Sequence, residues 1–281
     1  MPGKVSKIVH GDDLLYRFFG SLIEDRPDLA DEVLLRMYTS MGIWFPLDVY
    51  HRLPVMLPWV VRDPSCRGNK AKGLPDEWGA PNNLGFFRDD NSLVKALTRS
   101  LRVHAVAMPH LHGAKMGTEF VASHIWRVGK SGELVSRNPI LNSFVPNLVW
   151  LPSQVAKLTD REGSVMQYAL QAIAWRRYRN APVHQDLKQV VEEAWENLPA
   201  PAKASPVVKA VNEFVATDLF LQTRRDKIRS VIQALELIAT GSGVSGKVIS
   251  TRYTEGLPNV SAAERRALLL FLQSFATDTL Q

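Results

Sequence analysis

The sequence predicts a mainly helical protein of the α+β class, with a small β element near the middle of the chain. Over residues 12–50, apolar side chains recur every three or four positions, which is the spacing of one face of an amphipathic helix. The same spacing dominates from residue 181 to the end. Between these regions, two short apolar segments at 118–126 and 146–152 have the length of strands, and a loop rich in Gly, Ser and Asn joins them.

The pattern divides the chain into four expected segments. They are an N-terminal helical segment (1–61), a loop-rich segment with a short helix (62–103), a central core (104–180) and a C-terminal helical region (181–281). The loop-rich segment is dense in Gly, Pro, Asn and Asp, a composition typical of loops. Further expected elements are a helix over 92–103, a helix from 207 that stops at Gly241, a strand over 247–253 and a helix that begins at Ser261.

Composition favours a soluble globular protein. The chain has 281 residues, of which 46% are hydrophobic and 22% are charged. Its apolar runs are shorter than the roughly 20 residues of a membrane-spanning helix, and the N-terminus lacks an apolar signal core, so we expect a cytoplasmic protein and no membrane partner. Cys66 is the single cysteine, which excludes an intramolecular disulfide and a cysteine-cluster zinc site.

The net charge of +6 is unevenly distributed along the chain. Residues 1–59 carry −2, residues 60–160 carry +5 and residues 161–281 carry +3. A basic surface favours a polyanionic partner, because binding releases counterions. At this modest charge, an ordinary solvated surface is the alternative.

His124 and Asn147 are the leading candidates for chemistry. His124 lies in the first apolar segment, Asn147 opens the second, and a helical pattern follows from Ser153. Imidazole supplies a general base with a pKa near neutrality, and the carboxamide would orient that imidazole or bridge the two strands. The alternative is a structural histidine packed beside Trp126, with Asn147 capping a turn.

This stretch resembles the HNH, or ββα-metal, nucleases over about residues 118–175. The resemblance rests on the histidine of SHIW, the asparagine of PNLVWLP and the helical pattern that follows. It implies a ββα-metal element embedded in a helical protein. It also implies phosphodiester hydrolysis with His124 as general base and Asn147 as its partner, assisted by a divalent cation, above all Mg²⁺.

Two positions depart from the pattern of that family. Ser123 stands where the family has a metal-binding acid, and Ala156 stands where it has a third ligand. Asp160 lies one helical turn after Ala156 on the same face, so we expect it to reach the same metal. If it does not, the element serves binding only.

Other histidines and acids are further candidate ligands. His110 and His112 share one face of an extended segment, with His104 shortly before them, and this spacing is compatible with a metal. Ordinary loop histidines are the alternative. Asp89 and Asp90 precede an apolar helix, where capping explains them better than metal binding.

The segment 241–248 has the letters of a phosphate-binding loop but not its context. Val248 follows Lys247 where such a loop needs Ser or Thr, and a helical pattern rather than a strand precedes Gly241. We therefore expect no nucleotide cofactor.

Clustered basic residues are the candidate DNA contacts, because the guanidinium fork matches phosphate oxygens. They occur near His124 and in the stretches AWRRYRN and QTRRDKIRS. The candidates are Arg127, Lys157, Arg176, Arg177, Arg179, Arg224 and Arg225. Solvated helix faces are the alternative for each cluster.

Together these features predict a metal-dependent DNA endonuclease of a bacterial restriction or phage-defence type. Its partner would be DNA, and cutting at palindromes would fit a homodimer. The main alternative is a non-catalytic DNA-binding or regulatory protein with a degenerate ββα element. A helical scaffold for protein partners is a third class.

Overall fold

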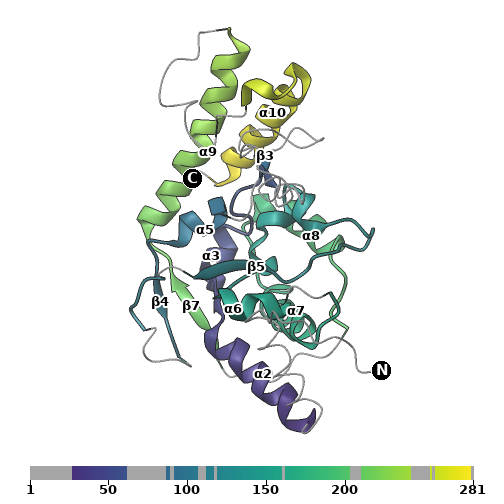
Figure 1. Ribbon diagram of the computed structural model, residues 1–281. Coiled ribbons are helices and arrows are strands. Elements are labelled where there is room, and N and C mark those ends of the chain that lie inside the picture. The colour runs from purple at the N-terminus through teal and green to yellow at the C-terminus, as the bar shows by residue number, and fades with distance from the viewer. Residues whose placement is uncertain are drawn as a thin grey trace, which may run out of the picture.

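A small sheet surrounded by helices organises the fold (Figure 1). The computed structural model describes residues 27–61, 87–88, 92–106, 112–116, 119–159, 162–202, 210–241, 254 and 257–279. Its helices are α2 (Pro27–Met41), α3 (Leu47–Arg52), α5 (Ser92–Thr98), α6 (Ser153–Ala156), α7 (Val165–Tyr178), α8 (Lys188–Glu196), α9 (Asp218–Ala239) and α10 (Ala262–Thr279). Its strands are β1 (Ile43–Trp44), β2 (Val60–Val61), β3 (Phe87–Arg88), β4 (Arg102–His104), β5 (Phe120–His124), β6 (Leu148–Pro152) and β7 (Asn212–Val215). The described part is therefore a mainly helical α+β structure, as predicted.

The main sheet is mixed and has five strands in the order β4-β7-β1-β6-β5. Strand β1 runs parallel to β7, and the other neighbours are antiparallel. β4 and β5 are therefore the two edges of this sheet. The strands come from all four predicted segments, since β4 begins at Arg102 in the loop-rich segment, so these segments share one sheet. A separate parallel pair joins β2 to β3, with Val60 opposite Phe87.

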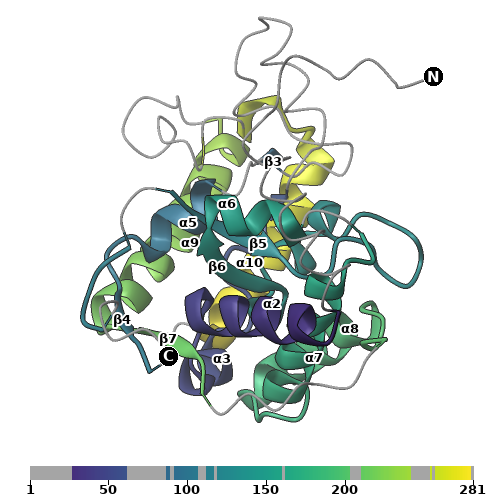
Figure 2. The same ribbon diagram turned by 60° about the horizontal axis from the view of Figure 1, so that its bottom comes forward.

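Helices cover the sheet from two sides. Figure 1 shows α9 and α10 together above the strands and α2 and α7 below them, and in Figure 2 α2 lies in front of β6. The first four residues of β6 are buried, as expected for a strand covered on both faces. Phe45 lies at the centre of the aromatic core, with its ring centre 5.3 Å from that of Trp150 and 5.1 Å from that of Phe214.

Local capping explains where three helices begin. The hydroxyls of Thr217 and Ser164 accept hydrogen bonds from backbone N–H groups in the first turns of α9 and α7. Ser261 and Glu264 form a reciprocal capping box, which confirms the predicted start of α10. Helix α9 ends shortly before Gly241, whose φ of 66° lies in the left-handed region.

Four predicted elements differ from the structure. The helix predicted over 92–103 ends at Thr98, and Arg102–His104 is strand β4. The helix predicted over 12–50 is interrupted by β1, and residues before 27 lie outside the described part. The helical pattern after Ser153 breaks into α6, a 3₁₀ turn and α7. The helix predicted from 207 is wrong at its start, because Asn212–Val215 is strand β7. The strand predicted over 247–253 lies outside the described residues.

Pairing with distant segments explains β7. Asn212 lies opposite Ile43 of β1, and its carboxamide nitrogen donates to the carbonyl of Ser40 at 2.6 Å. These bonds come from more than 160 positions away, so no local pattern encodes them.

Among the described residues, no helix is long and apolar enough to span a membrane.

Candidate functional site

His124 lies at the last position of edge strand β5, opposite Leu148 of β6. Its ring is partly buried, and Nε2 lies 2.7 Å from the backbone oxygen of Asn142. A carbonyl oxygen only accepts hydrogen bonds, so Nε2 carries the hydrogen in the neutral ring. In that tautomer the lone pair is on Nδ1.

Asn147 lies one residue before β6 and is fully buried. Its Oδ1 accepts from the backbone N–H of Trp126 at 2.7 Å, and its Nδ2 donates to the carbonyl of Leu141 at 3.1 Å. Of the two predicted roles, these contacts match the bridging one. The carboxamide ties both limbs of the 125–147 loop together, and it thereby fixes the backbone on either side of the imidazole.

Asn142 is a third residue of the candidate site, and its sequence context does not mark it as one. Its carbonyl contacts His124, and its own Nδ2 donates to the carbonyl of Val60 at 2.9 Å. The side chain is fully buried, and its Oδ1 accepts no hydrogen bond from the described residues. An Asn-Ser pair inside an apolar stretch was the only available signal, and it is a weak one.

The described residues around His124 do not make a metal-ligand set. No group of three His, Cys, Asp or Glu side chains in the described part of the chain is arranged to hold an ion. Ser123 and Ala156 are 8% and 5% exposed, and neither supplies a carboxylate. Asp160 lies outside the described residues, as do Asp89 and Asp90, so the fit of a divalent cation depends on a side chain that the structure does not describe.

The structure does not bring His112 to His124. Rings of His112 and His104 are in contact, with centres 5.0 Å apart, and His104 belongs to β4. Edges β4 and β5 are separated by three strands, or roughly 19 Å at about 4.8 Å per strand. Side chains cannot share one ion across that distance, so the prediction that His112 completes a metal site beside His124 does not hold. His110 lies outside the described residues.

Two further basic candidates are Arg127 and Lys157. Arg127 follows His124 by three residues on the 125–147 loop and is partly exposed. Lys157 is exposed and lies in the 3₁₀ turn after α6. Arg127 is placed to contact a polyanion bound over the loop, whereas Lys157 follows the end of β6 that pairs with Phe120, away from His124.

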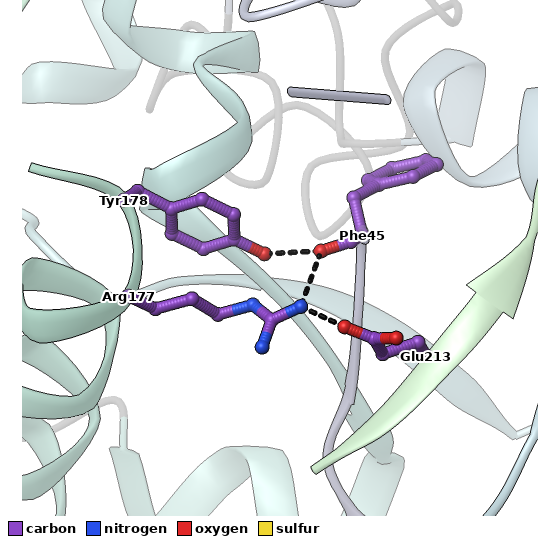
Figure 3. Close-up of polar contacts among 4 residues, drawn as sticks. All are labelled: Phe45, Arg177, Tyr178 and Glu213. Atoms are coloured by element: carbon purple, nitrogen blue, oxygen red, sulfur yellow. Dashed lines mark hydrogen bonds and ion pairs between the residues drawn. The ribbon is translucent and has the colours of Figure 1, made fainter. Parts of the chain in front are cut away.

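The arginines of α7 have different environments. Arg177 forms an ion pair with Glu213 of β7 and donates to the carbonyl of Phe45 at 3.4 Å, as Figure 3 shows. Tyr178 donates to the same carbonyl at 2.5 Å, and burial raises the pKa of its phenol. Arg177 therefore joins α7 to β7 and to the residue after β1. Its guanidinium is already engaged within the protein.

The neighbouring arginines are more accessible. Arg176 is exposed. Arg179 is partly exposed and lies over the rings of Trp175 and Trp195, at 5.7 and 5.8 Å from their centres. Such stacking stabilises a guanidinium while leaving its edge open to an anion. Arg176 and Arg179 thus remain candidate DNA contacts.

Arg224 is buried, which corrects its assignment as a phosphate contact. Its side chain donates to the carbonyls of Met56 and Val55 at 2.8 and 2.9 Å, and it is 2% exposed. Burial lowers the pKa of Arg224 to about 9, so the group is still charged at neutral pH. Arg225 is partly buried and donates to Gln222 at 2.9 Å.

Comparison with known proteins provides no relative. No protein-family model, no curated protein and no solved structure matches this chain. The functional hypothesis therefore depends on the geometry of the 125–147 loop and on the charges around it.

Proposed function

We propose that this chain is a DNA endonuclease in which His124 is the general base. The observation that carries the proposal is the imidazole at the end of β5, with Nε2 held by the Asn142 carbonyl. That contact orients the ring and puts the basic lone pair on Nδ1. A histidine fixed in one tautomer suits proton abstraction from an attacking water, since its ordinary pKa lies near neutrality.

The surrounding loop provides the rigidity that such a base needs. The carboxamide of Asn147 connects Trp126 to Leu141. Leu141 is next to Asn142, whose carbonyl contacts His124. Both carboxamide contacts are buried, so water does not compete with them. Asn147 is thus a positioning residue in the proposal, and it acts through the backbone rather than on the substrate.

Accessible positive charge supports DNA as the substrate. Arg127, Lys157, Arg176 and Arg179 have accessible side chains, and residues 60–160 hold most of the net positive charge. Phosphate contacts of this kind position a nucleic acid without reading its bases. The proposal includes a restriction or phage-defence role, because such enzymes act by cleaving DNA.

Mg²⁺ is part of the proposal only through Asp160. The described residues alone supply no ligand set, so no step of the reaction is assigned to a metal. We predict that cleavage requires a divalent ion, and comparing DNA cleavage with Mg²⁺ and with EDTA measures this.

Cleavage of plasmid and phage DNA, modified and unmodified, tests the proposal. We expect discrete fragments with Mg²⁺, Mn²⁺ or Ni²⁺ and none with EDTA. In His124→Ala the cleavage rate should fall by about 100-fold or more, the usual contribution of a general base, while DNA binding in a gel-shift assay is unchanged. His184→Ala is the matched control, because His184 is an exposed histidine with a 51% accessible side chain.

Two outcomes would contradict the proposal. Cleavage by His124→Ala at the wild-type rate would remove His124 as the base. Salt-sensitive binding without cleavage under any ion would favour the second candidate, a non-catalytic DNA-binding protein. The buried Ser123 and Ala156, which supply no carboxylate beside His124, are the observation that favours this second candidate.

A further inference from the structure

Edge strand β4 continues into a hairpin that contains a β-bulge. The backbone N–H of Val103 donates to the carbonyl of Ala114 at 2.9 Å, and the N–H of Gly113 donates to the carbonyl of Val103 at 2.8 Å. Two residues therefore oppose one, and Gly113 has the left-handed φ of 74° that this type of bulge requires. Arg102 opposite Lys115 continues the pairing beyond the bulge.

This register places His104 directly across from His112. His104 follows Val103 and His112 precedes Gly113, so the two histidines are paired across the hairpin. Side chains opposite each other on paired strands lie on one face. Both histidines are exposed, and their ring centres are 5.0 Å apart. The backbone, fixed by the bulge, holds two imidazoles side by side at the edge of the sheet.

The spacing of the two rings matches chelation of one ion. With a metal–nitrogen distance of about 2.0–2.1 Å and tetrahedral angles, two imidazoles bound to one ion have ring centres about 5 Å apart. Within the described part of the chain, neither ring forms a side-chain hydrogen bond that would occupy its nitrogens. Imidazole ligands suit Zn²⁺, Ni²⁺, Co²⁺ and Cu²⁺ and not Mg²⁺.

The nearby charges are mixed. Arg102 lies close to the pair, with its guanidinium donating to the carbonyl of Gly113, the residue after His112, at 2.6 Å. Glu213 lies opposite His104 on β7 and forms an ion pair with Arg177. Lys115 is exposed and lies beyond the bulge.

We propose that His104 and His112 form a binding site for one transition-metal ion of the Zn²⁺ or Ni²⁺ type. The site lies at the opposite edge of the sheet from His124, and water completes the coordination. It does not depend on the nuclease proposal. A bound ion joins the two limbs of the hairpin and stabilises this edge of the sheet.

Metal titration of the full chain, purified without a polyhistidine tag, tests the site. Isothermal calorimetry with ZnCl₂ and absorption spectra with Co²⁺ should show one equivalent bound to the wild type. His104→Ala and His112→Ala should each lower that affinity by at least about tenfold, since each removes one of two protein ligands. Both side chains are exposed, so the variants should fold, and circular dichroism checks this.

His184→Ala is the control and should still bind one equivalent of the metal ion. Thermal unfolding is the second measurement: saturating Zn²⁺ should raise the Tm of the wild type and of His184→Ala, but not of either hairpin variant. Wild-type affinity in both hairpin variants would overturn the proposal. Loss of Zn²⁺ affinity in His112→Ala but not in His104→Ala would also overturn the proposal, because the ion would then use ligands other than this pair.

Discussion

Arg224 brings a positive charge into the interior, although its sequence context is that of a solvated basic run. Its guanidinium donates to two backbone carbonyls and lies 5.6 Å from the ring centre of Phe275. Among the described residues, no carboxylate pairs with it. The carbonyls of Val55 and Met56 thus obtain their donors from a helix almost 170 positions away, and the residue joins α9 to the segment before β2.

Arg224→Ala should lower the free energy of unfolding by about 3 kcal/mol, because it leaves two buried carbonyls without donors and opens a cavity. Urea unfolding measures the change. Arg224→Met should lower the free energy of unfolding by less, because the methionine side chain fills the volume that alanine leaves empty. The control is Arg229→Ala on the exposed face of α9, with a change within about 0.5 kcal/mol. Equal midpoints for Arg224→Ala and Arg229→Ala would show that the buried contacts contribute nothing.

The 125–147 loop behaves as an element in its own right, although it contains little regular secondary structure. The backbone N–H of Ile125 donates to the carbonyl of Asn147 at 2.9 Å, which closes the base of the loop next to the β5–β6 pair. The carboxamide of Asn147 then joins Trp126 to Leu141. This side chain adds to the backbone bonds within the loop, and His124 contacts the loop at the carbonyl of Asn142.

Asn147→Ala should destabilise the protein by about 3 kcal/mol, because a buried donor and a buried acceptor lose their partners. Amide hydrogen exchange should quicken in the 125–147 loop more than in α9. Asn197→Ala is the control, since Asn197 is exposed and its carboxamide donates only to a helix carbonyl. Unchanged exchange in the loop would show that Asn147 does not hold it.

At the scale of the whole molecule, two buried tyrosines pack helix α3 against helix α7. The rings of Tyr50 on α3 and Tyr178 on α7 have centres 5.0 Å apart. Burial raises the pKa of Tyr50 to about 12, and burial also raises that of Tyr178. An unfolded tyrosine ionises near pH 10, so between pH 10 and 12 the unfolded state loses a proton that the folded state keeps.

Folding stability should therefore fall as the pH rises from 10 to 12, by about 3 kcal/mol from Tyr50 alone. Arg224 acts in the opposite sense, because its lowered pKa makes the folded state release a proton first above about pH 9. Tyr50→Phe isolates the tyrosine: its urea unfolding should have a shallower pH slope over this range than the wild type. Tyr168→Phe, at a partly exposed tyrosine of α7, should keep the wild-type slope. Equal slopes for all three proteins would refute the assignment.

Much of the local structure could be predicted from the sequence, because its causes are local. The strands at 120–124 and 148–152 have a clear apolar pattern, and the capping box at Ser261 and the stop before Gly241 are signals of a few adjacent residues. The positions of His124 at a strand end and of Asn147 just before the next strand follow from the same patterns. The catalytic hypothesis itself stays a prediction.

What the sequence alone determined is the class of fold and the location of its central strands and helix ends, since neighbouring residues specify these. The tertiary structure decided which polar groups meet. It made Asn212–Val215 a strand by pairing it with Ile43, buried Arg224 against Val55 and Met56, and separated His112 from His124 by the width of the sheet. Pairing, burial and distance between remote segments depend on how the whole chain packs, and no local pattern of residues records them.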